Sequence, residues 1–367
     1  MNRARRTITS IPLAAIIGGL PQLTLGKTAK PVSQSTTQTV SESGNRRPTR
    51  PTRPPRLRRG DGVALINPGG VVSEANVERA IANAETLGLV PQLGRNLRLK
   101  YGGYAGSARE RVDDLHAAWR DPDVKAIWSV RGGSGTAQIL PLVDFALLRA
   151  TPKVLMGFSD MTALLNAVTA HTGLITFHTP SGISTLSPYS RRNMEQIIFD
   201  APQHYAMLPA LENEARSGAE PEYAVRTQRG GRVEGELVGG NLAVFASLVG
   251  TAYMPSLANK VLFLEDINEA PYRIDRMLTQ LVQAMTHTKQ FPAATVFGVC
   301  RRCEATDGEA SLTLQEVIRD YAASQPGPVA SGYSFGHIAA QMSLPIGARA
   351  ALDTYERSLT LVEAAVA

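Results

Sequence analysis

A serine between a predicted strand and a predicted helix is the strongest candidate for chemistry in this sequence. The β-rich run 153–158 leads into Ser159, and a helical pattern follows from Asp160 to His171. A serine on such a turn projects from the edge of a sheet, near backbone N–H groups that can stabilise an oxyanion. The second glycine of the G-x-S-x-G pattern is missing, so two interpretations stay open. Ser159 is either a nucleophile or the N-cap of the helix, with Asp160 favouring the helix dipole.

A serine nucleophile also needs a base, and two of the six histidines are candidates. His337 lies in a loop among glycine and small residues, whereas His178 closes the predicted strand 174–177. A loop histidine is the better candidate, but the local pattern does not decide between the two. The other four histidines have surroundings typical of helices, helix ends or polar segments: His116, His171, His204 and His287.

Two carboxylates, Glu265 and Asp266, end the apolar run 261–264. A carboxylate in that position is expected to be partly buried and must have a partner. Either it orients the base of a serine nucleophile, or it forms a salt bridge to Arg273 or Arg276 in the next predicted helix.

The glycine-rich turn 131–135 offers backbone N–H groups that can bind an oxyanion, a substrate carboxylate or a phosphate. It lacks the G-x-G-x-x-G spacing and no Walker lysine follows it, so a nucleotide site has no further support. Cys300 and Cys303 have the spacing of a redox pair without its usual context, which favours structural thiols. H-E-x-x-H is absent, and the sequence predicts neither a metal site nor a cofactor.

Strand and helix patterns alternate through the first half of the chain. Predicted strands cover 63–66, 124–130 and 153–158, and predicted helices cover 73–87, 107–120 and 160–171. Alternation with short turns implies an α/β fold with a doubly wound, mainly parallel sheet, which binds ligands at the carboxyl ends of its strands. We assign residues 60–200 to this domain, 201–231 to an interdomain connection and 232–367 to a carboxy-terminal domain.

The formal net charge of +6 is unevenly distributed over the 367 residues. Residues 1–59 hold 12 basic residues and one acidic residue, whereas the remaining 308 residues hold 26 basic and 31 acidic ones. The body is therefore mildly acidic. A surface for binding duplex nucleic acid has no support there, and we expect no nucleic-acid partner.

The amino-terminal residues 1–29 combine a basic start with an apolar stretch, as in an export signal. They predict an exported, periplasmic protein, and the alternative is an uncleaved segment on a cytoplasmic one. Prolines and glycines interrupt the apolar stretch, so we expect no stable membrane span. Residues 30–59 are rich in Pro, Arg, Ser and Thr, which predicts a disordered basic linker. It is either a solvated spacer or a segment that contacts an anionic wall polymer or membrane.

Several motifs occur in the order typical of the LD-carboxypeptidase family of serine peptidases, which residues 60–352 resemble. They are YGGYAG (101–106), RGGSG (131–135), GFSDMTAL (157–164), GGNL (239–242), EDINEAPYRIDRM (265–277), FGH (335–337) and LPIG (344–347). The resemblance implies a smaller, largely β carboxy-terminal domain that supplies Glu and His to a site on the α/β domain. The PYRIDR segment favours the muramoyl-tetrapeptide carboxypeptidase branch over the related microcin-immunity peptidases.

The resemblance also implies a role for each matching residue. Ser159 is the nucleophile, His337 the general base and Glu265 the residue that orients it, with an oxyanion hole from the N–H groups of Asp160 and Gly133. The implied reaction cuts an L–D amide bond and releases the terminal D-Ala of a murein tetrapeptide, without metal or cofactor.

The resemblance further suggests a homodimer. Two positions depart from the family pattern, since Ser134 replaces an aromatic residue and Thr179 replaces a glycine. Both departures put the preferred acyl donor in question. The competing hypotheses are a microcin-immunity-like serine peptidase and a catalytically silent protein that binds the cell wall.

Overall fold

The computed structural model describes residues 51–306, 308 and 310–367, all within the unit Asn45–Ala367. The predicted export signal 1–29 and the linker residues 30–50 lie outside the described residues. No helix among those described combines the length and apolar character needed to cross a membrane.

The first sheet has six strands in the order β12-β5-β4-β3-β1-β2. Its strands are β1 (Gly62–Ile66), β2 (Val90–Leu93), β3 (Val124–Ser129), β4 (Val154–Gly157), β5 (Thr176–His178) and β12 (Leu344–Ile346). The first five run parallel, and β12 pairs antiparallel with β5. All residues of β1 and β4 are buried, as expected for parallel strands covered on both faces.

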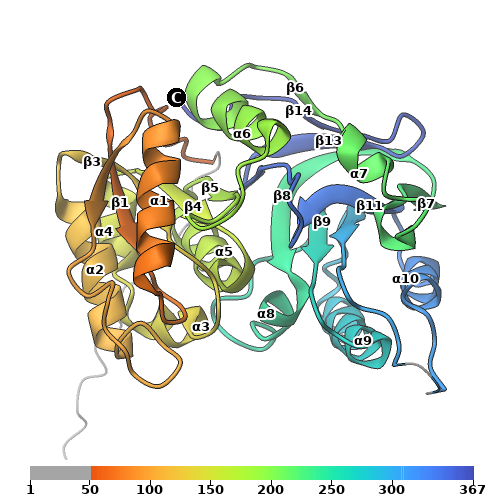
Figure 1. The fold of residues 1–367 in the computed structure, drawn as a ribbon. Coiled ribbons are helices and arrows are strands. Elements are labelled where there is room, and N and C mark those ends of the chain that lie inside the picture. Colours follow the sequence, from red (N-terminus) through yellow and green to blue (C-terminus); the bar gives the residue numbers. More distant parts are fainter. Residues whose placement is uncertain (1–50, 307, 309) are drawn as a thin grey trace, which may run out of the picture. The chain divides into compact units, whose positions relative to one another are not determined.

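Helices connect these parallel strands, and their ends follow from the sequence. The main ones are α1 (Glu74–Thr86), α2 (Ala108–Arg120) and α5 (Thr162–Thr172). Ser73 and Ser107 are the N-caps of α1 and α2, and each forms a capping box. Helix α5 contacts β4 and β5 on one side and β8 of the second sheet on the other, so it lies between the two sheets (Figure 1).

The second sheet has eight strands in the order β6-β14-β13-β8-β9-β10-β11-β7. Its strands are β6 (Tyr205–Met207), β7 (Arg226–Arg229), β8 (Arg232–Asn241), β9 (Lys260–Glu265), β10 (Ala294–Val299), β11 (Val329–Gly336), β13 (Arg349–Asp353) and β14 (Ser358–Leu361). The central strands β8 to β11 run parallel, and the outer ones pair antiparallel.

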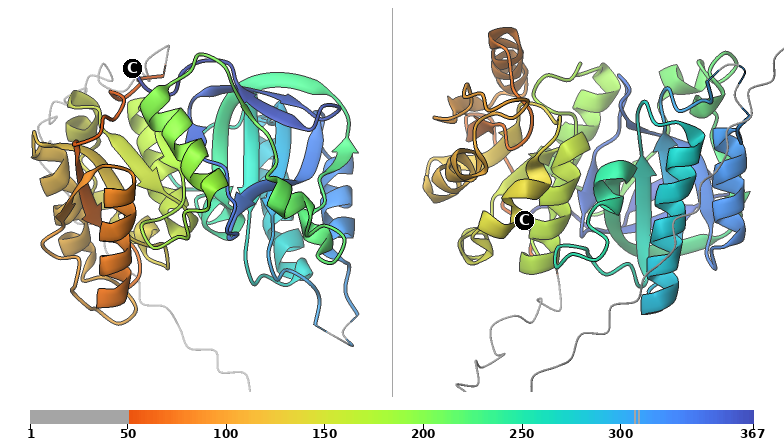
Figure 2. Two further views of the ribbon diagram at one scale, coloured as in Figure 1. Left: turned by 45° about the horizontal axis from the view of Figure 1, so that its top comes forward. Right: turned by 90° about the horizontal axis from the view of Figure 1, so that it is seen from below.

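Three helices pack on one face of this sheet through a shared apolar cluster (Figures 1 and 2). They are α8 (Leu242–Ala246), α9 (Pro271–Thr288) and α10 (Leu314–Ala323). The side chains on the other face, such as Phe263 and Tyr333, join the same apolar cluster as the first sheet. The expected fold class is thus confirmed, with a parallel α/β domain followed by a sheet-rich domain.

Shorter helical segments complete the chain. They are α3 (Thr136–Ile139), α4 (Phe145–Ala150), α6 (Pro188–Glu195), α7 (Leu211–Glu214), η1 (Leu140–Leu142), η2 (Ser159–Met161), η3 (Gln196–Asp200) and η4 (Pro221–Tyr223).

The structure differs from the expected chain organisation in three places. Residues 51–59, assigned to the disordered linker, pack on the body: Thr52 bridges to Leu174, Arg53 pairs with Glu363 at 2.6 Å, and Leu57 is buried. The segment 201–231, expected as an interdomain connection, contains the two edge strands β6 and β7 of the second sheet. Strand β12, from the expected carboxy-terminal domain, pairs with β5 of the first sheet.

Candidate active site

Ser159 lies on a sharp turn at the carboxyl end of β4. Its φ is +62°, a left-handed conformation that a non-glycine residue adopts only at a cost of about 1–3 kcal/mol. The N-cap of the following turn is Phe158, and no side chain caps it. The N-cap interpretation of Ser159 is therefore wrong. The strained turn instead presents its hydroxyl at the edge of the sheet, as a nucleophile elbow does.

A continuous hydrogen-bonded chain joins Ser159 to a histidine and a carboxylate of the second sheet. His337 Nε2 lies 3.1 Å from Ser159 Oγ, and His337 Nδ1 lies 2.8 Å from Glu265 Oε2. Glu265 is the last residue of β9, and His337 directly follows β11. This is the geometry of a Ser-His-carboxylate triad, in which the histidine takes the serine proton and the carboxylate holds the imidazole.

A glycine before His337 makes room for this contact. Gly336 has φ +121°, and a Cβ built on it would lie 3.0 Å from Glu265 Oε2. A side chain at residue 336 would therefore press on the carboxylate that holds His337.

The electrostatic interaction between His337 and Glu265 suits a role for His337 as a general base. Burial by itself lowers the pKa of His337, but the charge of Glu265 and the hydrogen bond to it outweigh that effect and the pKa is raised. Burial raises the pKa of Glu265, yet the charge of His337 and their hydrogen bond bring it below its usual range. Glu265 is thus an anion at neutral pH although it is completely buried. It stabilises the imidazolium that forms when His337 accepts a proton.

The glycine-rich turn lies directly against Ser159. A Cβ built on Gly132 would lie 2.9 Å from Ser159 Oγ and 3.1 Å from the amide nitrogen of Asp160. Gly133, which the family resemblance implies for the oxyanion hole, packs on Gly70, with its built Cβ 3.0 Å from the Gly70 Cα. Among the described residues, the N–H groups of Asp160, Gly132 and Gly133 have no backbone acceptor. The choice of Gly133 over Gly132 stays a prediction.

Asp160 fixes the glycine-rich turn beside the nucleophile. Its Oδ2 accepts hydrogen bonds from Thr136 N at 2.8 Å and from Thr136 Oγ1 at 2.6 Å. Burial raises the pKa of Asp160, and the bonds from Thr136 and the charge of Arg111 oppose that rise. These two bonds connect Asp160, which follows Ser159, to Thr136, which follows the glycine-rich turn.

Arg111 supports the same turn, and the sequence analysis missed it. This residue of α2 is buried, and its Nη1 donates to Pro68 O at 2.6 Å and to Gly135 O at 2.8 Å. One signal was available: Arg111 precedes the buried Leu115 by four residues and so shares its helix face.

Other sequence candidates do not join the site. His178 is completely buried, and neither ring nitrogen has a hydrogen-bond partner among the residues described. Burial lowers the pKa of His178 to about 4, so it is neutral at physiological pH. The salt bridge considered for Glu265 and Asp266 is also absent from the described part of the chain, where Arg273 pairs with Glu269.

Asp266 has hydrogen-bond partners of another kind. It accepts from Asn241 Nδ2 and from Ala243 N, both at 2.9 Å, and so holds the start of α8. Burial and the neighbouring charge of Glu265 raise the pKa of Asp266 to about 6. Cys300 and Cys303 are buried free thiols, which agrees with the structural interpretation.

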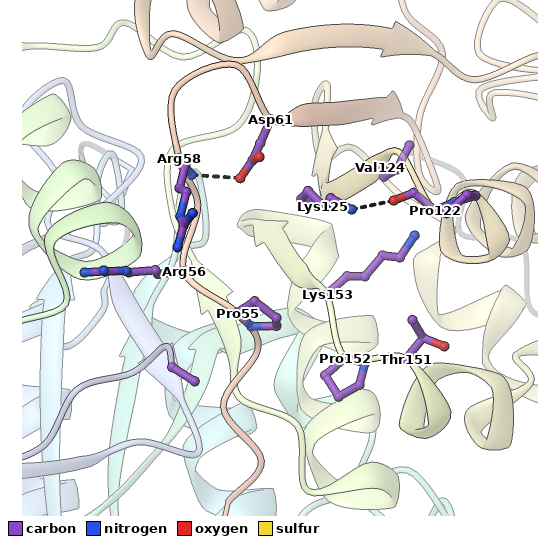
Figure 3. A pocket seen from close by; sticks show the side chains of 11 residues that line it. Pro55, Arg56, Arg58, Asp61, Pro122, Val124, Lys125, Thr151, Pro152 and Lys153 are labelled. Carbon is purple, nitrogen blue, oxygen red and sulfur yellow. Dashed lines mark hydrogen bonds between the residues drawn. The ribbon is translucent and has the colours of Figure 1, made fainter.

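A cavity of about 520 Å³ lies at the opposite edge of the first sheet, where β1, β3 and β4 begin (Figure 3). Four basic residues contribute to its lining: Arg56, Arg58, Lys125 and Lys153. Lys153 is buried and donates to the carbonyl oxygens of Ala118 and Asp121, so it caps the end of α2. The length of β4 separates this cavity from Ser159. Over the described residues, no cluster of three His, Cys, Asp or Glu residues could hold a metal ion.

The residues of this site lie within two segments that match models of known domains. Residues 63–179 match the model of the LD-carboxypeptidase N-terminal domain, and residues 234–352 match that of the LD-carboxypeptidase C-terminal domain. The chain belongs to the LD-carboxypeptidase family. It is a serine carboxypeptidase. Ser159 lies in the segment that matches the N-terminal domain, and Glu265 and His337 lie in the segment that matches the C-terminal domain.

Two relatives carry names that refer to murein. The probable murein peptide carboxypeptidase of Bacillus subtilis is 36% identical over 323 residues, covering 86% of this chain and 95% of that protein. The murein tetrapeptide carboxypeptidase of Pseudomonas aeruginosa is 34% identical and covers 79% of this chain and 92% of its own length.

One solved structure and one more distant sequence relative extend the comparison. The muramoyltetrapeptide carboxypeptidase of Oxalobacter formigenes has a TM-score of 0.69 at 28% identity, covering 82% of this chain and 97% of that one. The microcin C7 self-immunity protein of Escherichia coli is 26% identical, covering 71% of this chain and 80% of its own length.

Proposed function

We propose that this serine carboxypeptidase releases the terminal D-Ala of murein tetrapeptides by hydrolysing the L–D amide bond. The observation that carries the proposal is the hydrogen-bonded chain from Ser159 through His337 to Glu265 in a member of this family. The names of the two murein carboxypeptidases that are more than 30% identical support the choice of substrate.

The geometry supports a two-step acyl transfer. Ser159 Oγ attacks the carbonyl carbon of the penultimate L-centre while its proton passes to His337 Nε2, 3.1 Å away. The N–H of Asp160 and one from the glycine-rich turn stabilise the oxyanion. The C–N bond then breaks, and His337 gives its proton to the departing D-Ala amine. Water attacks the acyl-enzyme, His337 takes a proton from it, and the peptide acid leaves as Ser159 is protonated again.

The proposal is tested by incubating the purified protein with a murein tetrapeptide and measuring free D-Ala and the tripeptide. An epimer that ends in L-Ala serves as the control for the L–D bond. We expect D-Ala release that EDTA does not reduce, because no step of the mechanism uses a metal. Equal cleavage of both epimers would overturn the L–D assignment.

A microcin-type substrate is the alternative that the likeness to the self-immunity protein raises. Efficient cleavage of an aminoacyl-nucleotide analogue together with no D-Ala release would favour that alternative. A protein that releases neither product would instead fit the catalytically silent wall binder.

Replacing Glu265 with glutamine is expected to shift the pH dependence of the reaction. His337 must be neutral to act as a base, so its raised pKa sets the acid limb of kcat/KM above its ordinary value near pH 6.5. Glu265→Gln removes the charge that raises this pKa, while the burial that lowers it remains. The acid limb should therefore move to lower pH, and kcat should fall roughly 10²–10⁴-fold because the imidazole loses its orienting anion.

A kcat/KM profile from pH 4 to 9 measures both effects. Glu269→Gln is the matched control, since Glu269 pairs with the exposed Arg273 and with no other basic residue in the described ranges. An unshifted acid limb in Glu265→Gln would contradict the assigned role of Glu265.

Replacing Gly132 with alanine is expected to damage the site through sterics alone. The added methyl group would lie 2.8 Å from Ser159 Cβ, so the elbow or the glycine-rich turn must move. Displacement of the nucleophile by a fraction of an ångström should lower kcat/KM roughly 10–100-fold. Gly218→Ala is the control, since nothing lies within 4 Å of its built Cβ. Wild-type kinetics in Gly132→Ala would show that this close approach does not position Ser159.

A further inference from the structure

Arg131 stands beside the nucleophile at the carboxyl edge of the first sheet. Strands β3 and β4 are parallel neighbours, with Trp128 opposite Met156. Continuing this register by three residues brings Arg131 level with Ser159. The contact of the next residue, Gly132, with Ser159 agrees with that placement.

Within the described part of the chain, the Arg131 guanidinium has one hydrogen-bond acceptor. The backbone N–H of Arg131 donates to Asn67 Oδ1 at 2.9 Å, and its Nη1 donates to Val71 O at 3.1 Å. Its Nη2 lies 3.8 Å from the Cβ built on Gly133. No carboxylate of the described chain pairs with it. Arg131 is half-buried, and its Nε and Nη2 have no hydrogen-bond acceptor among the described residues.

The other arginine of this edge is enclosed, and its Nε is buried without a hydrogen-bond partner among the described residues. Arg111 is buried, and its two terminal nitrogens donate to Pro68 O, Gly135 O and Gln138 Oε1. Among the described residues, Arg131 is thus the arginine whose backbone lies level with Ser159 and whose guanidinium keeps N–H donors without a protein acceptor. A guanidinium with paired donors matches the geometry of a carboxylate.

A carboxypeptidase must place a free carboxylate close to its nucleophile. In a substrate whose leaving group is one residue, the carboxylate carbon lies three bonds from the scissile carbonyl, at most about 4 Å away. The attacked carbon itself lies about 3 Å from Ser159 Oγ. The carboxylate therefore falls within reach of residues that directly adjoin Ser159.

We propose that Arg131 binds the terminal carboxylate of the peptide substrate and so confines the enzyme to removing the last residue. This inference rests on the proposed function, since it concerns the same site and the same leaving group. It assigns Arg131 a role in substrate specificity, with a peptide carboxylate as its ligand.

The test compares two substrates that differ only in this carboxylate, the murein tetrapeptide and the same peptide ending in D-alaninamide. Wild-type enzyme should prefer the free acid by roughly 100-fold in kcat/KM. Arg131→Met should lose this preference, because kcat/KM for the acid falls while that for the amide stays within about threefold. Arg131→Lys should keep part of the preference through its remaining charge. Arg98→Met, which removes an exposed arginine bonded to Glu74, should behave as wild type.

Each outcome bears on one claim. If wild type cleaves acid and amide equally, or if Arg131→Met keeps the preference for the acid, the role of Arg131 is overturned while the peptidase activity stands. If wild type cleaves neither, the proposed function fails and this inference fails with it. Inhibition of the wild type by its product gives a measurement independent of any variant's folding. Free D-Ala should compete with substrate and D-alaninamide should not, and equal inhibition by both would overturn the proposal.

Discussion

Ser159→Ala is expected to lower kcat for D-Ala release by roughly 10⁴–10⁶-fold. The substitution removes the atom that attacks the scissile carbonyl, and no other hydroxyl of the described residues is bonded to His337. Residual turnover would come from water attacking a substrate held by the oxyanion hole. The fold should persist, because the hydroxyl makes a single hydrogen bond to the residues that the structure describes, and alanine is as strained as serine at a φ of +62°.

The rate is measured as free D-Ala, and folding by the thermal midpoint. Ser247→Ala is the matched control, since Ser247 is exposed and its hydroxyl donates to Val244 O, one turn earlier in the chain. Turnover of Ser159→Ala at the wild-type rate would rule out Ser159 as the nucleophile.

His337→Ala is the second substitution with a large expected effect. Without the imidazole, Ser159 loses the acceptor of its proton and the leaving amine loses its donor, so kcat should fall roughly 10⁴–10⁶-fold. Removing both residues should cost little more than removing one, because they act as a unit. His204→Ala, which removes an exposed imidazole, should leave the rate unchanged.

The comparison of single and double variants decides whether the residues are coupled. Two single losses that multiply in the double variant would mean that Ser159 and His337 act independently. That result would contradict the proton transfer between them.

The local sequence pattern pointed to candidate residues for this site but could not predict which of them lie together. His178 is the last residue of β5 and His337 directly follows β11, and the sequence pattern left the base undecided between them. Only His337 reaches Ser159, because β11 belongs to the second sheet and ends opposite the elbow, whereas His178 is enclosed beside Phe158 and Phe263. That choice depends on how two sheets pack, and hydrophobic periodicity carries no information on it.

Interactions distant in sequence account for the other differences. Strand β12 (residues 344–346) pairs with β5, although the other strands of the first sheet all come from residues 62–178. Likewise, Thr52 and Arg53 are held by partners more than 100 residues away. A segment poor in apolar residues was expected to be disordered, yet Leu57 is buried and backbone hydrogen bonds fix its neighbours. Composition averages over such a segment and misses anchors such as Thr52, Arg53 and Leu57.

The supporting groups around Ser159 show the same limit. Helical spacing could have placed Arg111 on the buried face of α2, but not against the glycine-rich turn that it holds. The contact of Gly132 with Ser159 follows from the register of β3 and β4, which only the paired strands reveal.

The most direct test of the account is a rapid-quench experiment in which excess murein tetrapeptide is mixed with the enzyme and the protein mass is followed. We predict a transient adduct with the mass of the tripeptide acyl group, located on the peptide that contains Ser159 and missing from Ser159→Ala. An adduct on a different residue, or D-Ala release that proceeds undiminished in Ser159→Ala, would contradict the account.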